Sequence, residues 1–114
     1  MSARGETLLW LAQRASAAVL GVLVLVHLGT MVYAVQGGLS AAEILGRTRG
    51  SPLWGAFYGL FVVMVAVHAP IGMRNVLAET FGWRGRGLGL AMLALGLFLL
   101  AFGWRAVSAV VATP

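Results

Sequence analysis

The sequence has no cysteine, no lysine and no aspartate, and only 10% of its 114 residues are charged. Without cysteine, the chain offers no disulfide, no ligand to an iron–sulfur cluster, no thiol nucleophile and no attachment point for a c-type haem. About a quarter of the residues of a soluble domain are charged. Here 61% are hydrophobic and the mean hydropathy is +0.94. Lipid is therefore the expected solvent for much of this chain.

The few charges are eight arginines and three glutamates, which give a net charge of +5. They lie singly or in pairs outside the apolar runs, without a basic face or alternating aromatic and basic residues, so we expect no nucleic-acid binding. Arginines that flank apolar runs are typical of membrane spans. No composition break divides the chain, so residues 1–114 are predicted to form one domain.

Three apolar segments predict an all-α membrane protein with three transmembrane helices, at about residues 8–35, 53–77 and 88–104. About 20 helical residues cross a hydrocarbon layer of about 30 Å. The first segment is too long for the apolar region of a cleaved signal peptide, so we expect it to be retained. Residues 39–50 are expected to form a helical turn outside the bilayer.

Capping residues predict where the helices begin. Thr7 is expected to cap the first span. Ser40, with Glu43 three residues later, has the pattern of a capping box for the connecting turn. Ser51 followed by Pro52 predicts the start of the second span.

Proline and glycine residues predict a bend in one span and close packing of another. Pro70 lacks an N–H group, so the carbonyl of Ala66 loses its helical hydrogen bond and we expect a bend just after His68. Gly89 and Gly96, in the third span, would let a neighbouring helix approach closely.

Three spans place the N-terminus and the loop between the second and third spans on one side of the membrane. That side carries five arginines and the other side three. The excess favours an N-terminus in the cytoplasm. The five are Arg4, Arg14, Arg74, Arg84 and Arg86, and the three are Arg47, Arg49 and Arg105.

His68 is the first candidate for chemistry, because polar side chains within hydrocarbon are costly. It lies six residues, about 9 Å of helix, from Arg74, which is expected to mark the cytoplasmic interface. A neutral imidazole is a ready axial ligand for haem iron. Gly72, one turn away, leaves a recess for a porphyrin plane, and Arg74 can meet a propionate. The alternative role of His68 is a hydrogen bond between helices.

His27 is the second membrane histidine. It lies 13 residues beyond Arg14, about 20 Å along the helix, and so roughly 10 Å deeper than His68. We therefore expect His27 and His68 of one chain not to share an iron, and the second ligand to come from another chain. His27 shares a helix face with Gln13 and Ser16. That stripe fits either an interhelical hydrogen-bonding face, or a second haem or a proton path.

Arg14 begins the apolar part of the first span. An arginine there is usually an anchor whose charged end reaches the interface. With Ser16 and Trp10 it is alternatively a donor to a quinone carbonyl. The three glutamates are scattered, and no paired carboxylates, Ser-His-Asp set or phosphate-binding glycine loop is present, so a self-contained enzyme is not expected.

Two motifs resemble a known family. His68-x3-Gly72-x-Arg74 followed by Glu79, and Gln13-Arg14-Ala15-Ser16 at the head of the first span, resemble segments of the cytochrome b membrane-anchor subunits of succinate dehydrogenase and fumarate reductase. The resemblance covers nearly the whole chain in length, number of spans and order of motifs.

The resemblance implies that His68 is an axial ligand of the iron of haem b. It also implies that Arg14, Ser16, Gly72 and Arg74 lie in the haem and quinone region. The chain would anchor a flavoprotein and an iron–sulfur subunit of a succinate:quinone oxidoreductase-type complex in a bacterial cytoplasmic membrane. Its helices would join a larger bundle with a second membrane-anchor subunit or a second copy of the chain.

Two departures from the family pattern keep alternatives open. Gln13 replaces the histidine that precedes the arginine in the family, and Asn75 replaces a histidine that often follows Arg74. Propionate contacts are therefore not carried over to these positions, and a haem-free structural anchor remains an alternative. A different class is a small transporter or proton-conducting helical bundle that uses Gln13, Ser16 and His27.

Overall fold

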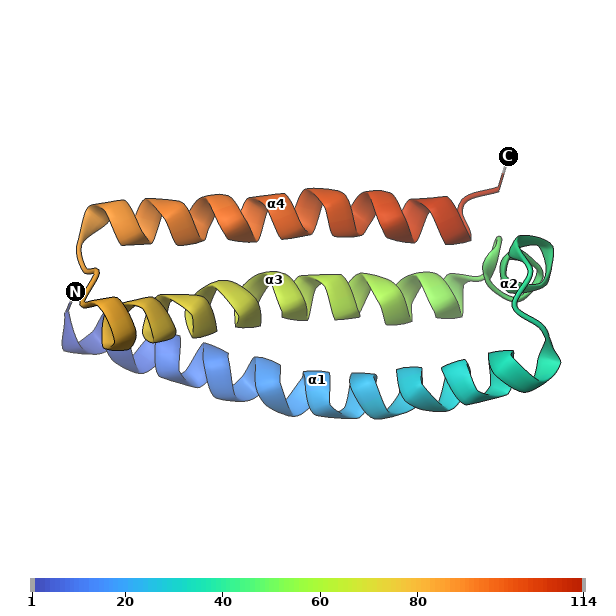
Figure 1. Cartoon of the computed structure of the whole chain (residues 1–114), viewed down its shortest axis with the longest axis horizontal. Coiled ribbons are helices and arrows are strands. Elements are labelled where there is room, and N and C mark those ends of the chain that lie inside the picture. Colours follow the sequence, from blue (N-terminus) through green and yellow to red (C-terminus); the bar gives the residue numbers. More distant parts are fainter. Residues whose placement is uncertain (1, 114) are drawn as a thin grey trace.

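The computed structural model describes residues 2–113, which form four helices and no strand (Figure 1). Three of the helices are long and apolar enough to cross a membrane. The prediction of an all-α protein with three spanning helices is confirmed. The helices are α1 (Ala3–Gly37), α2 (Ala41–Thr48), α3 (Pro52–Phe81) and α4 (Arg86–Val111).

Each long helix contains one of the predicted spans and continues beyond it at both ends. At the start of α1, the Ser2 hydroxyl accepts a hydrogen bond of 3.1 Å from the Gly5 N–H, so Ser2 is the cap. The prediction for Thr7 was wrong, because Thr7 lies inside α1 and its hydroxyl donates to the Ala3 carbonyl. Apolar patterning marks the part of a helix that crosses hydrocarbon, whereas the helix itself continues until its end groups find other partners.

The other predicted helix starts are confirmed. The Ser40 hydroxyl accepts from the Glu43 N–H at 3.1 Å and donates to the Glu43 carboxylate at 2.7 Å. The Ser51 hydroxyl accepts from the Trp54 N–H at 3.2 Å, and Pro52 is the first residue of α3. These side chains satisfy N–H groups that the first turn of a helix leaves without partners.

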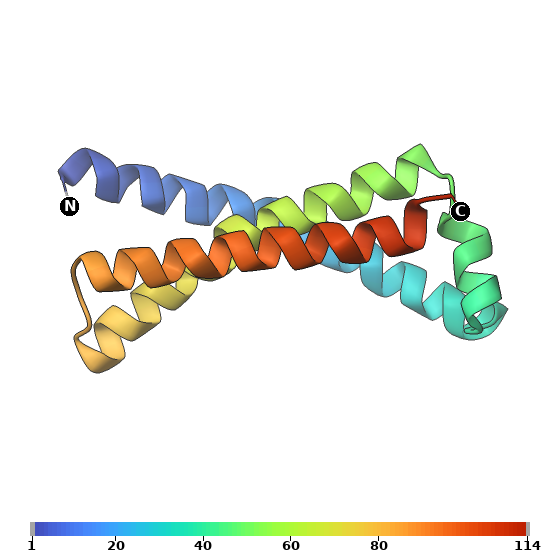
Figure 2. The same ribbon diagram turned by 90° about the horizontal axis from the view of Figure 1, so that it is seen from above.

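In space, α3 packs against both α1 and α4 (Figure 1), and α1 crosses α3 in the view from above (Figure 2). The N-terminus and the α3–α4 turn lie at one end of the molecule, and α2 lies at the other. There the Thr48 hydroxyl donates to the Val110 carbonyl at 2.6 Å, and the Gly50 N–H donates to the Val111 carbonyl at 2.7 Å. The last carbonyls of a helix have no partner within it. The segment around α2 thus caps the C-terminal end of α4.

Two glycines of α4 allow its close approach to α3. A Cβ atom at Gly103 would lie 2.5 Å from Cγ1 of Val62. One at Gly96 would lie 3.2 Å from the carbonyl oxygen of Ala66, the group whose helical partner Pro70 removes. The prediction of close packing is confirmed for Gly96.

Among the described residues, a Cβ atom at Gly89 would meet nothing within 4 Å, so no other helix of this chain approaches closely there. Sequence spacing does not say which face of a helix meets a neighbour.

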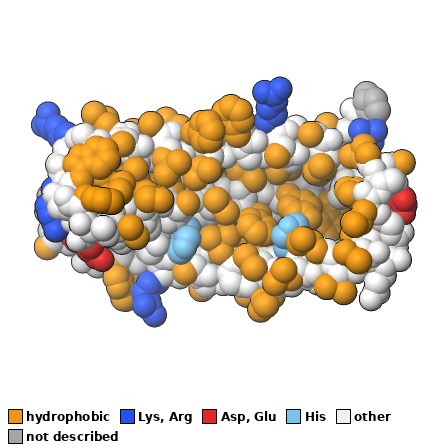
Figure 3. Space-filling view, viewed as in Figure 1, with side chains coloured by type: hydrophobic (Ala, Val, Ile, Leu, Met, Phe, Trp, Pro, Cys, Tyr) orange, Lys and Arg blue, Asp and Glu red, His pale blue; other side chains and the backbone are white. Residues whose placement is uncertain are grey.

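Few side chains are buried within the chain. Among residues 2–113, the buried hydrophobic side chains are Leu23, Pro70, Leu88 and Val107. Figure 3 shows hydrophobic side chains spread along the whole length of the face, between the backbone and other side chains. In a bilayer such side chains lie in a medium as apolar as themselves, so their exposure carries no penalty.

Candidate functional site

His68 lies on α3 and faces α1. Its Nδ1 atom lies 3.3 Å from the Ser16 hydroxyl oxygen. His68 is half-buried, whereas Ser16 is only 2% exposed. Within residues 2–113, the Ser16 hydroxyl is the hydrogen-bond partner of the His68 ring. The Nε2 atom, on the other side of the ring, remains available to a group outside the chain.

Gly72 and Gln13 meet beside this histidine. A Cβ atom at Gly72 would lie 3.1 Å from Nε2 of Gln13. The amide of Gln13 therefore covers the recess that the sequence predicts for a porphyrin plane. Among the described residues, the Gln13 Oε1 atom is buried and has no hydrogen-bond partner. A buried acceptor without a partner costs about 1–3 kcal/mol, so a donor from outside this chain would stabilise the site.

Arg74 forms an ion pair with Glu6 of α1. The distance between Arg74 Nη2 and Glu6 Oε1 is 3.1 Å, and the two side chains are 24% and 54% exposed. Exposed pairs contribute little, so Arg74 can exchange this partner for another anion at small cost. Nothing in the sequence singled out Glu6, because 68 residues separate it from Arg74.

Arg14 is exposed, and its guanidinium lies 5.3 Å from the centre of the Trp10 ring. Two residues along a helix correspond to about 200°, so Arg14 and Ser16 point to nearly opposite sides of α1. The structure pairs Arg14 with Trp10 and Ser16 with His68. It does not bring Arg14 and Ser16 together.

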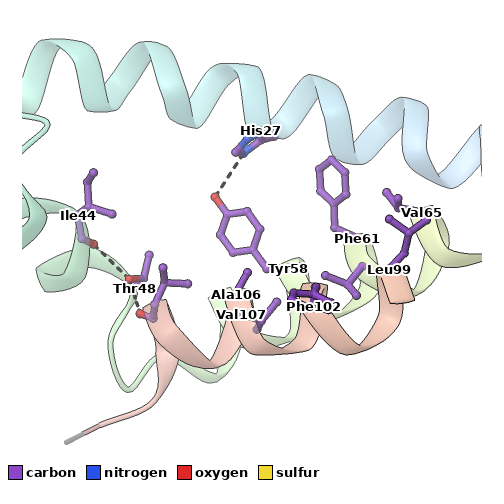
Figure 4. Close-up of a pocket in the computed structure, with 13 residues that line it drawn as sticks. His27, Ile44, Thr48, Tyr58, Phe61, Val65, Leu99, Phe102, Ala106 and Val107 are labelled. Atoms are coloured by element: carbon purple, nitrogen blue, oxygen red, sulfur yellow. Dashed lines mark hydrogen bonds between the residues drawn. The ribbon is translucent and has the colours of Figure 1, made fainter. Parts of the chain in front are cut away.

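His27 has a separate partner, Tyr58 of α3, whose hydroxyl lies 3.3 Å from His27 Nδ1 (Figure 4). The rings of Tyr58 and Phe61 both meet the imidazole edge-on, with centroids 5.7 Å away. The pair borders a cavity of about 490 Å³ whose other walls are mainly apolar and include Leu99 and Phe102. Tyr58 and His27 are 31 residues apart in the sequence, so no local pattern indicates this contact.

These contacts fix the relative depths of the two histidines. His27 lies 11 residues after Ser16, and Tyr58 lies 10 residues before His68. At 1.5 Å per residue, both paths separate the histidines by about 15–17 Å along the helices. That is larger than the roughly 10 Å expected from sequence, because Arg14 is nearly level with His68 rather than with Arg74. The two imidazoles of one chain are too far apart to ligate one iron.

Both histidines are visible on the same face of the molecule (Figure 3). Within residues 2–113, no group of three or more His, Cys, Asp or Glu side chains is arranged to hold a metal ion.

The helices and their polar contacts define an integral membrane protein with three spanning helices. Residues 1–103 match the family described as the succinate dehydrogenase/fumarate reductase transmembrane subunit. The chain is also 34% identical over 98 residues to a succinate dehydrogenase hydrophobic membrane anchor subunit from Archaeoglobus fulgidus. The matched region covers 85% of this chain and 82% of that relative. No solved structure matches the chain. The chain belongs to the succinate dehydrogenase/fumarate reductase transmembrane subunit family, as its motifs predicted.

Proposed function

We propose that this chain is the cytochrome b membrane anchor of a succinate dehydrogenase or fumarate reductase complex, with His68 as an axial ligand of haem b. One observation carries the proposal: the His68 ring is held at Nδ1 and open at Nε2. Metal-bound histidines commonly have this arrangement, in which the nitrogen away from the metal is held by a hydrogen bond. The second ligand would come from a companion anchor or a second copy, because His27 lies about 15–17 Å away along the helices.

Haem b would supply one-electron transfer between the iron–sulfur subunit and quinone. The residues of this chain would hold it in a defined position. His68 presents its imidazole, Arg74 offers a guanidinium for a propionate, and Gln13 presents an amide over Gly72. Because the Gln13 amide lies over Gly72, it leaves less space for a porphyrin plane than the glycine alone would. This observation favours a second candidate function, a haem-free anchor.

The end of the molecule that holds the N-terminus is proposed to face the cytoplasm and to bind the soluble subunits. A polar hollow of about 720 Å³ lies there, between α3, the α3–α4 turn and the start of α1. Its charged lining residues are three arginines and two glutamates, so it suits a partner surface with an acidic character. They are Arg74, Arg84, Arg86, Glu6 and Glu79.

Arg14 is proposed to donate to a quinone carbonyl. Its guanidinium is exposed beside Trp10 and lies about 3 Å in depth from Ser16, hence near the level of His68. A positive charge at that place would stabilise the negative charge that develops on a quinone oxygen as it is reduced. Arg14→Leu should raise the apparent KM for quinone or abolish reduction, whereas Arg4→Leu, at the exposed start of α1, should leave both unchanged. Unaltered quinone kinetics in Arg14→Leu would remove this residue from the site.

The proposed function is tested by purifying the tagged chain from the membranes of its own host. We expect flavin and iron to co-purify with it, together with a reduced-minus-oxidised spectrum of b-type haem. Recovery without flavin and iron would contradict the role as an anchor. Recovery with flavin and iron but without haem would leave the haem-free anchor as the function.

A further inference from the structure

Ser16 has one hydroxyl hydrogen and two neighbours within hydrogen-bond distance. The hydroxyl donates to the carbonyl of Gln13, three residues earlier in α1, at 3.1 Å. Such bonds from serine back to its own helix are common. With its hydrogen engaged there, the Ser16 oxygen can act only as an acceptor toward Nδ1 of His68, 3.3 Å away.

A neutral imidazole carries one N–H, on either Nδ1 or Nε2. Because the Ser16 oxygen accepts, the hydrogen belongs on Nδ1 and the lone pair on Nε2. A rotated Ser16 hydroxyl would instead donate to Nδ1 and place the hydrogen on Nε2, which then could not bind a metal. Whether the Ser16 hydroxyl accepts from Nδ1 or donates to it thus determines whether Nε2 of His68 carries a lone pair.

We propose that Ser16 is a positioning residue that fixes the tautomer and the ring orientation of His68. The role toward iron rests on the proposed function, whereas the tautomer is a property of this chain alone. Ser16 is only 2% exposed, so water does not compete for the bond, and the crossing of α1 and α3 sets the direction of the ring. The same burial separates Ser16 from a quinone, although the family resemblance placed it in the haem and quinone region.

The first test is a redox titration of the haem in the purified complex for Ser16→Ala and Ser16→Thr. Loss of a hydrogen-bond partner behind a metal ligand typically weakens metal binding 10–100-fold. We expect Ser16→Ala to bind haem more weakly and at a higher midpoint potential, because a less basic imidazole stabilises the ferric form less. A tenfold larger loss of affinity for the ferric than for the ferrous form corresponds to about 59 mV. Ser16→Thr retains the hydroxyl and should keep the wild-type potential.

Thr30→Ala is the matched control. The Thr30 hydroxyl also donates to a carbonyl three residues earlier in α1, that of His27, at 2.7 Å, and makes no contact with His68. We expect an unchanged potential in this variant. Wild-type haem content and potential in Ser16→Ala, or equal shifts in Ser16→Ala and Ser16→Thr, would overturn the proposal.

The second test does not depend on the folding of a variant. In wild-type complex prepared without haem, ¹⁵N NMR of labelled histidine should place the proton of His68 on Nδ1. A proton on Nε2 would overturn the proposal. A wild-type complex that never contains haem would refute the proposed function instead, and the tautomer would still be measured.

Discussion

Gly103→Ala should destabilise the packing of α4 on α3. The added methyl carbon would lie 2.5 Å from Cγ1 and 2.9 Å from Cγ2 of Val62. Carbon atoms in contact are normally about 3.5–4.0 Å apart, so the overlap amounts to about 1 Å. The branched Val62 side chain has few alternative rotamers within a helix, so either the helices separate or the valine is strained.

The expected cost follows from two opposing effects. Overpacking of this kind costs about 1–3 kcal/mol, whereas replacing glycine by alanine within a helix gains about 1 kcal/mol. Gly89→Ala, in the same helix, gains the same propensity without a clash, because nothing lies within 4 Å of its Cβ position. The difference in the free energy of unfolding between the two variants should therefore be about 1–3 kcal/mol.

Unfolding of the purified chain by SDS in detergent micelles, followed by tryptophan fluorescence, measures this difference. Trp104 lies at the edge of the same interface, where a Cβ atom at Gly59 would meet its ring at 4.0 Å. In a background in which Trp10, Trp54 and Trp83 are replaced by phenylalanine, its emission should report the separation of α3 and α4. Equal stability of Gly103→Ala and Gly89→Ala would refute the close packing of the two helices at Gly103.

Two further predictions concern polar contacts at opposite ends of the molecule. Thr48→Val removes the hydroxyl that donates to the Val110 carbonyl at 2.6 Å. The substitution should lower the free energy of unfolding by about 1–3 kcal/mol and speed hydrogen exchange in α2. Unchanged exchange would show that other contacts hold α2 in place. Glu6→Gln removes the carboxylate charge paired with Arg74 and should lower the free energy of unfolding by less than about 1 kcal/mol, since the pair is exposed. A larger loss would mean that the pair stabilises the crossing of α1 and α3.

The main elements of the fold could be predicted from sequence because hydrophobic length and capping residues are local signals. The three spans, the Ser40–Glu43 pair and the Ser51–Pro52 start all follow from residues near one another in the chain. Helix ends outside the apolar segments could not be placed, as the extension of α1 to Ala3 shows. Polar residues that flank an apolar segment can also be helical, so only the capping residue shows where the helix begins.

The candidate site could be predicted only residue by residue. His68 was singled out because a histidine within hydrocarbon is costly, but its contact with Ser16 joins residues 52 apart. Such contacts depend on how far α1 is shifted along its axis relative to α3, and no short sequence pattern indicates that shift. The assumption that Arg14 is level with Arg74 consequently placed His27 too close to His68.

The two histidines have different surroundings. His68 has a hydrogen-bonded Nδ1 and lies nearer than His27 to the end of the molecule that carries most arginines. His27 instead contacts Tyr58 beside an apolar cavity. Only His68 lies within the motif that resembles the cytochrome b anchors. The proposed haem site is therefore at His68, and His27 serves as the matched control.

The proposed ligand is tested by the reduced-minus-oxidised haem spectrum of the purified complex in His68→Ala and His27→Ala. We expect His68→Ala to lose the b-type haem bands while flavin and iron still co-purify, and His27→Ala to retain the wild-type spectrum. An unchanged spectrum in His68→Ala, or loss of haem in His27→Ala alone, would contradict the assignment of His68 as the ligand.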